Sequence, residues 1–178
     1  MILIISTCQD KLSEEEFVKP ITNIVKNSKK DYKIKHFMDV GYVDDYEKII
    51  ICGTALKDNE YLNHLNKFSW LKNTNKEVLG ICSGMQIIAL TFNAKLIQQK
   101  EIGMTQITTK SRNKLFSKEF EVYNLHQNSL TDLDEFDILA TTENDSVQAI
   151  KHKHKQFYGI IFHPEVRNET IVENFILP

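Results

Sequence analysis

Short apolar runs recur along the first half of the chain, separated by longer stretches of mixed polarity. Residues 47–53 are apolar enough for a strand buried on both faces, as in the centre of a parallel sheet. We predict strands over MILIIS (1–6), DYKIKHF (31–37), EKIIICG (47–53) and EVLGI (77–81). Between them, residues 58–71 place apolar side chains at helical spacing, and a further helix is predicted from Cys82 to Phe92. Strands separated by helices predict right-handed βαβ units and a parallel sheet.

Another helix is predicted shortly after the first strand. Ser13 followed by Glu16 matches a capping box, in which both side chains bond free backbone N–H groups at a helix start. The carboxylates of Glu14, Glu15 and Glu16 also favour the positive end of the helix dipole. Pro20 has no N–H group to donate, so it must either kink this helix or begin a new one.

The second half of the chain changes to shorter and more closely spaced strand-like runs. We predict strands over residues 95–98, 105–108, 120–125, 137–142, 147–150 and 157–162, and a closing helix over residues 168–177. Such spacing is typical of antiparallel ribbons added to a sheet. No repeat or Pro/Gly-rich linker interrupts the pattern. Residues 1–178 are therefore predicted to form a single domain of the α/β class.

Composition and charge exclude several classes of protein. With a formal net charge of −2 over 178 residues, the chain lacks the strong positive charge typical of nucleic-acid-binding domains. No apolar run approaches the roughly 20 residues of a membrane helix, and MILIIS lacks the basic region and cleavage site of a signal peptide. Cys8, Cys52 and Cys82 form no CxxC pair, which disfavours a zinc site or a disulfide framework. We expect a cytoplasmic protein that binds neither nucleic acid nor membrane.

The most informative local motif is Gly80-Ile81-Cys82-Ser83-Gly84, a G-x-C-x-G sequence between a predicted buried strand and a predicted helix. A nucleophile at such a turn sits in a strained backbone conformation, and the flanking glycines let the chain pass close by. The helix N-terminus favours a thiolate, and its free N–H groups can hold an oxyanion. The alternative is that Cys82 is a small buried hydrophobic residue at a plain turn.

A cysteine nucleophile needs a base, and His163 is the histidine best placed to be one. It follows the apolar run FYGIIF, so it lies at the carboxyl end of a strand, where open parallel sheets place their active sites. Pro164 stiffens the turn, and Glu165 can return to hold the second ring nitrogen. The remaining histidines have simpler interpretations: His36 and His64 as surface or core residues, His126 at a strand end, and His152 and His154 within a solvated hairpin tip, Lys151 to Lys155.

Two segments, GICSGMQIIA (80–89) and YGIIFHPEV (158–166), resemble the signature segments of class I glutamine amidotransferases. EKIIICG (47–53) lies where that family has the strand ending in its oxyanion glycine loop, and EIGM (101–104) and NLHQNS (124–129) fall on its second-half strands. The resemblance spans essentially the whole chain. It implies a doubly wound, mostly parallel central sheet flanked by helices, with antiparallel strands added in the second half.

The resemblance implies a catalytic triad of Cys82, His163 and Glu165. Cys82 would attack the side-chain amide carbon of L-glutamine, His163 would shuttle the proton, and Glu165 would orient His163. Ammonia leaves first, and water then hydrolyses the γ-glutamyl thioester to glutamate. By the same resemblance, the backbone N–H groups of Gly53 and Ser83 would form the oxyanion hole.

Substrate contacts are also implied by the resemblance: Gln86 would contact glutamine, and the backbone near Gln127 and Asn128 would bind its amino-acid end. The chain departs from the family in two places. Cys52-Gly53-Thr54-Ala55 keeps a single glycine where many members have a Gly-Gly-Pro or Gly-Pro-Gly loop, so one possibility is an oxyanion hole that forms only when a partner docks. His126 fits a shared histidine, whereas Gln127 and Asn128 match no familiar subgroup.

The family delivers ammonia to a synthetase, and this sequence contains no P-loop, no ATP-grasp pattern and no second domain. The implied partner is a separate synthetase subunit, to which ATP and magnesium would belong, with no cofactor or metal in this chain. Such a free-standing chain is most similar to the glutaminase subunit of GMP synthetases of the archaeal type. Two alternatives remain: a stand-alone hydrolase of another γ-glutamyl compound, and a non-catalytic regulatory or binding subunit.

Overall fold

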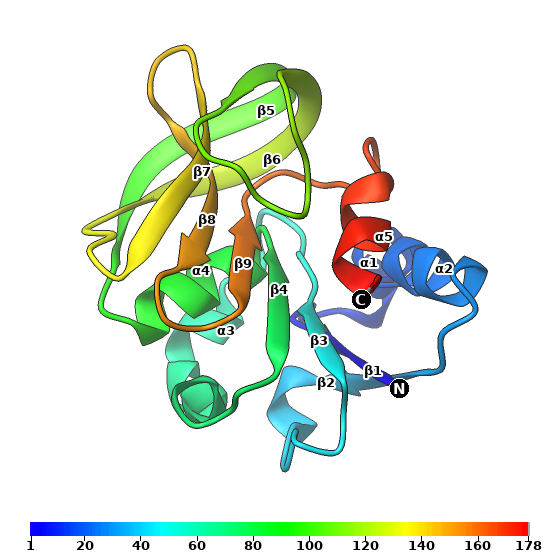
Figure 1. The fold of residues 1–178 in the computed structure, drawn as a ribbon. Coiled ribbons are helices and arrows are strands. Elements are labelled where there is room, and N and C mark those ends of the chain that lie inside the picture. Colours follow the sequence, from blue (N-terminus) through cyan, green and yellow to red (C-terminus); the bar gives the residue numbers. More distant parts are fainter. Residues whose placement is uncertain (178) are drawn as a thin grey trace.

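A computed structural model describes residues 1–177, which form one nine-stranded sheet in the order β2-β1-β3-β4-β9-β8-β7-β5-β6 (Figure 1). Neighbours from β2 to β9 in this order are parallel, and those from β9 to β6 are antiparallel. The predicted α/β class, with antiparallel strands added in the second half, is therefore confirmed. The strands are β1 (Ile2–Ser6), β2 (Tyr32–His36), β3 (Lys48–Ile51), β4 (Glu77–Ile81), β5 (Lys95–Thr109), β6 (Phe120–Thr131), β7 (Phe136–Thr142), β8 (Val147–His152) and β9 (Phe157–Ile160).

Helices cover both faces of the parallel strands, so the sheet is doubly wound. α1, α2 and α5 lie together on one side in Figure 1, where their apolar side chains pack with Ile4, Ile50 and Leu79. α4 and η2 pack against the opposite face, on Leu3 and Val78. None of the helices within residues 1–177 is long and apolar enough to cross a membrane. The helices are α1 (Lys11–Phe17), α2 (Lys19–Asn27), η1 (Phe37–Asp39), α3 (Glu60–Asn63), η2 (Leu65–Lys72), α4 (Ser83–Thr91) and α5 (Thr170–Ile176), of which η1 and η2 are 3-10 helices.

The beginning of the first helix was predicted wrongly. α1 begins at Lys11 with Asp10 as its N-cap, and no side chain caps it. The N–H of Ser13 already donates to the carbonyl of Asp10, so the predicted capping box is absent. Pro20 does begin a new helix: α1 ends at Phe17, and α2 carries Pro20 in its first turn, where a missing N–H costs nothing.

The helix predicted over residues 58–71 is two shorter elements, α3 and the 3-10 helix η2. Leu65, Phe68 and Leu71 recur every three residues, which matches the three residues per turn of a 3-10 helix. Phe68 and Leu71 are fully buried as a result. The spacing therefore predicted a buried helix face correctly, but the second half of the segment is a 3-10 helix and not an α-helix.

Three further predictions are corrected in the second half. The strands predicted at residues 95–98 and 105–108 are one strand, β5, with a register irregularity between Gln98 and Glu101. β6 continues past residue 125 to Thr131 because it pairs with β5 along most of its length. His152 is not solvated: only 3% of it is exposed, and its ring packs against the rings of Phe92 and Phe136.

Candidate active site

Gly53, Cys82 and His163 follow the carboxyl ends of three neighbouring parallel strands, β3, β4 and β9. Parallel register brings these ends to one edge of the sheet, where doubly wound folds place their sites. The proximity is close, because a methyl group at Gly53 would lie 2.8 Å from Cε1 of His163 and 3.3 Å from Cβ of Cys82. The structure therefore assembles residues that lie up to 110 positions apart, from 53 to 163.

Cys82 has the strained backbone that the G-x-C-x-G motif predicted. Its φ of 49° and ψ of −104° lie outside the regions that L-residues ordinarily occupy. Both motif glycines are required by close approach: a methyl group at Gly80 would lie 2.4 Å from the backbone of Gly84, and one at Gly84 would lie 2.3 Å from the carbonyl oxygen of Ile51. Cys82 is thus held at the N-terminus of α4 by packing that overrides its conformational preference.

His163 is oriented by Glu165, as the sequence predicted. Its Nδ1 lies 2.7 Å from Oε1 of Glu165, and both side chains are almost completely buried. The backbone N–H of His163 donates to the carbonyl of Tyr123, and the ring of Phe17 packs against the imidazole. Burial alone would lower the pKa of His163, but Cys82 and Glu165 together raise it well above its ordinary value. Because Nδ1 faces Glu165, Nε2 is left to serve the thiol.

The three cysteines are in different environments. Burial raises the pKa of Cys8 and that of Cys52, so both of these thiols stay protonated and unreactive. Cys82 lines a pocket, and its Sγ donates to the carbonyl of Leu125 on β6 at 3.7 Å. Of the three, Cys82 is therefore the one placed to meet a ligand.

The peptide between Cys52 and Gly53 is held in one orientation by two hydroxyl groups. Its carbonyl oxygen accepts from Oγ1 of Thr7 at 3.1 Å and from Oγ of Ser83 at 3.2 Å. The N–H of Gly53 belongs to the same planar peptide, so it is directed away from these hydroxyls. The N–H of Ser83 lies in the first turn of α4, where it has no acceptor within the helix. Both proposed oxyanion donors are thus fixed by the packing of the elbow against β3.

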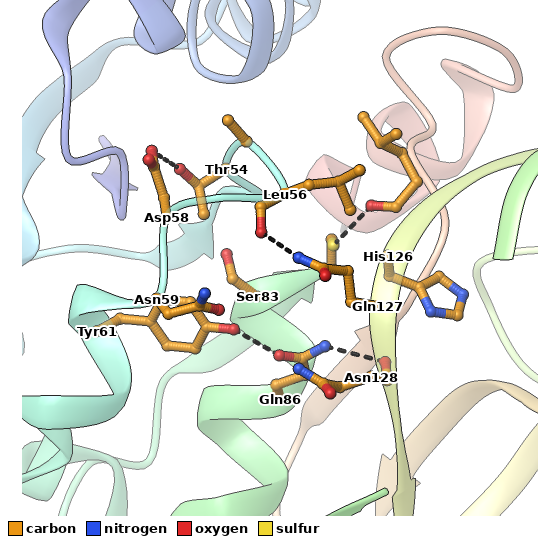
Figure 2. Close-up of a pocket in the computed structure, with 13 residues that line it drawn as sticks. Thr54, Leu56, Asp58, Asn59, Tyr61, Ser83, Gln86, His126, Gln127 and Asn128 are labelled. Carbon is orange, nitrogen blue, oxygen red and sulfur yellow. Dashed lines mark hydrogen bonds between the residues drawn. The ribbon is translucent and has the colours of Figure 1, made fainter. Parts of the chain in front are cut away.

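The pocket beside Cys82 has an empty volume of about 290 Å³, open in part to solvent, near the lower end of the range for small-molecule sites (Figure 2). Gln86 lies in its wall, held from both sides: Oη of Tyr61 donates to its Oε1 at 2.5 Å, and its Nε2 donates to the carbonyl of Asn128 at 3.2 Å. Burial raises the pKa of Tyr61, which keeps the phenol protonated as the donor. These two bonds fix the orientation of the Gln86 amide, with its oxygen toward Tyr61 and its nitrogen toward Asn128.

A loop of residues 54–59 forms the opposite wall of the pocket. Oγ1 of Thr54 donates to Asp58 at 2.6 Å, and Nε2 of Gln127 donates to the carbonyl of Leu56 at 2.5 Å (Figure 2). The second bond joins the loop to β6 across the pocket. The space is narrow, because hydrogen-bonded side chains from α4 and β6 extend across it. A ligand as large as an amino acid therefore requires some movement of this loop or of the side chains that line it.

The structure brings the eight candidate residues together. Cys82, Ser83, Gln86, Gln127 and Asn128 line the pocket, and Gly53, His163 and Glu165 adjoin it around Cys82.

Two contributors were not singled out from the sequence. Tyr61 was assigned only to an apolar helix face, because nothing in its spacing shows that its hydroxyl reaches Gln86. Asp58, which joins the 54–59 loop to the backbone N–H of Gln9, had no local signal. His126 was noted as a shared family residue; it is among the residues that line the pocket, and in Figure 2 its imidazole projects away from the side chains of Gln86 and Gln127.

Comparisons with known proteins agree with this geometry. The sequence pattern of the family described as glutamine amidotransferase class-I matches residues 18–176, almost the whole chain. The chain belongs to the class I glutamine amidotransferases. This amidotransferase is accordingly a glutamine-hydrolysing enzyme.

Among sequence relatives, a subunit of the glutamine-hydrolysing GMP synthase of Thermoplasma acidophilum is 30% identical over 150 residues, 78% of this chain and 75% of that protein. The corresponding subunit of Methanocaldococcus jannaschii is 34% identical over 113 residues, 58% of this chain and 60% of that protein.

Solved structures place the amidotransferase in the same fold. A Thermoplasma acidophilum protein assigned provisionally as a GMP synthase subunit superposes with a TM-score of 0.86 at 26% identity, over 98% of this chain and 91% of that one. A glutamine amidotransferase from Thermotoga maritima gives a TM-score of 0.72 at 16% identity, over 98% and 80% of the two chains. The second likeness shows the shared architecture alone.

Proposed function

We propose that this amidotransferase is the glutamine-hydrolysing component of a two-subunit GMP synthase, with Cys82, His163 and Glu165 as its catalytic residues. The observation that carries the chemistry is the strained Cys82 beside a buried His163 whose Nδ1 is bonded to Glu165 at 2.7 Å. The similarity to the corresponding subunits of the two GMP synthases named above supports GMP synthase as the enzyme that uses the ammonia.

The first half-reaction forms a thioester. Sγ of Cys82, whose proton is held by Nε2 of His163, attacks the side-chain amide carbon of glutamine. Breakdown of the tetrahedral adduct breaks the carbon–nitrogen bond, and His163 returns the proton so that ammonia leaves. Glu165 holds the ring and stabilises the imidazolium formed in between. The N–H groups of Gly53 and Ser83 stabilise the developing oxyanion.

The second half-reaction regenerates the enzyme. Nε2 of His163 takes a proton from water, whose oxygen attacks the thioester carbon, and the carbon–sulfur bond breaks to release glutamate. The proton returns to Sγ of Cys82. Gln86, with the β6 backbone at Gln127 and Asn128, binds the amino-acid end of the substrate in both steps.

Ammonia is the product passed on. A separate synthetase subunit binds ATP and magnesium, activates the nucleotide acceptor and receives the ammonia, so this chain needs no cofactor of its own. We propose that docking of the synthetase also moves the 54–59 loop that follows Gly53, because glutamine does not fit the narrow pocket between this loop and β6 without such movement.

The test is glutamate release from L-glutamine by the purified chain alone and with a GMP synthase ATP-pyrophosphatase subunit, ATP and xanthosine monophosphate. The proposal predicts turnover that rises in the complete mixture and is lost in Cys82→Ala and His163→Ala. Because triad residues act as one unit, the double variant should lose little more than either single one. His154→Ala changes an exposed histidine and serves as the matched control.

Each contrary result has a distinct meaning. Activity of the chain alone that the partner leaves unchanged would contradict the assigned acceptor and favour an independent hydrolase. If no mixture released glutamate, the result would contradict glutamine hydrolysis by this chain and favour a binding subunit. Glutamine hydrolysis retained by Cys82→Ala would refute the triad itself.

A further inference from the structure

A second histidine–carboxylate pair lies behind the pocket, on the far side of β6. His126 on β6 stands directly opposite Glu101 on β5 in the antiparallel ladder. Nε2 of His126 lies 3.4 Å from Oε2 of Glu101, and the exposed fractions of the two side chains are only 1% and 18%. In Figure 2 the His126 ring projects away from the cavity that Gln86 and Gln127 line. Within residues 1–177, no hydrogen bond or ion pair joins this pair to the side chains of Cys82, His163 or Glu165.

Glu101 is a partly buried charge with several hydrogen-bond partners. Oε2 accepts from Nδ2 of Asn124 at 3.0 Å and from Nε2 of Gln148 at 2.9 Å, and Oε1 accepts from Nε2 of Gln99 at 3.2 Å. Contact with His126, opposed by burial and helped by the hydroxyl of Ser146 and the amide of Gln148, lowers the pKa of Glu101 to about 2. Glu101 is therefore ionised at neutral pH. Its amide donors come from β5, β6 and β8, so the charge of Glu101 links these three strands.

The pair stands where the backbone ladder is irregular. β5 and β6 pair continuously from Ile107 and Phe120 to Glu101 and His126, and pairing resumes at Gln98 and Asn128. Two residues of β5 then oppose the single residue Gln127, as in a β-bulge, which redirects side chains and weakens local pairing. The backbone of β6 is thus least constrained by its ladder at the residues expected to bind substrate.

The other edge of β6 forms one wall of the active site. The carbonyl of Asn128 accepts from Gln86, and the side chain of Gln127 reaches Leu56. These contacts come from the two residues that follow His126. Any shift of β6 at His126 therefore moves the Gln86 clamp and the amino-acid subsite together.

We propose that Glu101 and His126 form a positioning pair that holds the segment of β6 opposite the β5 bulge in register for recognition of the amino-acid end of glutamine. The assignment rests on the proposed function, because it takes glutamine as the substrate. Neither residue contacts the substrate. The pair acts on binding rather than on the chemistry at Cys82, because β6 meets Cys82 and His163 through the carbonyls of Leu125 and Tyr123, which lie on the regularly paired side of the irregularity.

The experiment measures glutamate release by the complete two-subunit enzyme carrying Glu101→Gln or His126→Asn. We expect KM for glutamine to rise about tenfold in each variant, which corresponds to about 1.4 kcal/mol, while kcat stays within about twofold. The double variant should raise KM no further than the larger single effect, because either change breaks the same pair. Asp132→Asn removes an exposed ion pair, Lys95 to Asp132, between the same two strands and should leave KM unchanged.

A labelling assay on the free chain separates recognition from thiol reactivity. The glutamine-like electrophile 6-diazo-5-oxo-L-norleucine needs the amino-acid subsite to reach Cys82, whereas iodoacetamide does not. Glu101→Gln should slow labelling by the first reagent about tenfold and leave alkylation by the second unchanged. Thermal melting of each variant shows that it is folded at the assay temperature, and His126→Asn replaces Glu101→Gln should the latter melt too low.

Unchanged KM and unchanged labelling in both folded variants would overturn the positioning role. An equal slowing by both reagents would overturn it too, since the defect would then lie at Cys82. Failure of the wild-type enzyme to release glutamate would instead refute the proposed function, so the two failures are distinguishable.

Discussion

At the scale of single residues, the site depends on positions where a larger or differently charged side chain does not fit. Gly53 faces Cys82 and His163 at close range, and Gly80 and Gly84 lie against neighbouring backbone. His163 is held between a carboxylate and a thiol at almost complete burial. Local changes here act on catalysis more strongly than on folding, because they move reacting groups by fractions of an ångström.

Gly53→Ala tests this directly. The added methyl group would meet Cε1 of His163 at 2.8 Å, so the imidazole must move away from Cys82. We expect kcat to fall about 100-fold, a loss that misplacement of about 1 Å can cause. Gly41→Ala, where a methyl group meets nothing within 4 Å, is the control. Equal kcat values for the two variants in the glutamate-release assay would show that Gly53 is not at the reacting centre.

Glu165→Gln should change how stability depends on pH. The folded pKa of His163 is raised above its ordinary 6.5, so its stabilisation is fully present below that value and is lost as the pH rises through the folded pKa. Replacing Glu165 removes one of the groups that raise this pKa. The variant should be destabilised most below pH 6.5 and converge with the wild type at alkaline pH, with a slope of at most about 1.4 kcal/mol per pH unit for one proton.

Urea unfolding of the wild type and Glu165→Gln between pH 5 and pH 10 would measure this difference. A gap in unfolding free energy that widens with rising pH would contradict the assigned role of Glu165.

At the scale of elements, the pocket is the space between the 54–59 loop and β6. The loop is tied internally by Thr54 and Asp58 and externally by the bond from Gln127 to Leu56. Gln86 couples α4 to both Tyr61 on α3 and the backbone of β6. Opening the pocket for glutamine therefore breaks the exposed bond at Gln127 more easily than the buried ones at Gln86.

Gln127→Ala removes the bond between β6 and the loop. If the backbone at this position binds substrate, KM should change by less than about threefold, whereas iodoacetamide should alkylate Cys82 faster because the loop is released. Gln156→Ala, on an exposed turn, is the control for both measurements. A large rise in KM without faster alkylation would assign substrate contact to the Gln127 side chain instead.

At the scale of the whole molecule, the active site and a charged cluster lie at opposite ends of the parallel strands. Glu77, at the start of β4, contacts Lys114 and lies 3.2 Å from Lys48, whose Nζ also donates to the carbonyl of Phe175 at the end of α5. The cluster thus joins β3, β4, the loop before β6 and the closing helix. It contributes to stability at a distance from the chemistry.

Glu77→Gln should separate stability from activity. Burial opposes ionisation of Glu77, but Lys114 and Lys48 hold its pKa below the ordinary 4.5, so its stabilisation is present above that value and is lost as the pH falls through the folded pKa. We expect about 1 kcal/mol of destabilisation at pH 7, disappearing in strong acid, with kcat/KM unchanged. Urea unfolding and glutamate release would measure both, and a loss of kcat/KM at full stability would contradict this separation.

The sequence alone determined the α/β class, the nucleophile elbow at Cys82 and the partners His163 and Glu165. These are local properties: apolar runs show which strands are buried, and glycines or a proline mark turns whose backbone few other residues can adopt. The sequence determined the ends of the helices and strands less well. Residues 58–71 became a 3-10 helix in part, and β5 and β6 are longer than predicted, because pairing and packing decide where an element ends.

Only the tertiary structure decided which distant side chains meet. Tyr61 and Gln86 face each other because α3 and α4 share one side of the sheet, and Glu101 meets His126 because the β5–β6 register sets them opposite. No local pattern encodes such a register, since it follows from the sum of contacts along both strands. The residues proposed for catalysis are therefore marked by local sequence, whereas contacts such as Tyr61 to Gln86 and Glu101 to His126 are not.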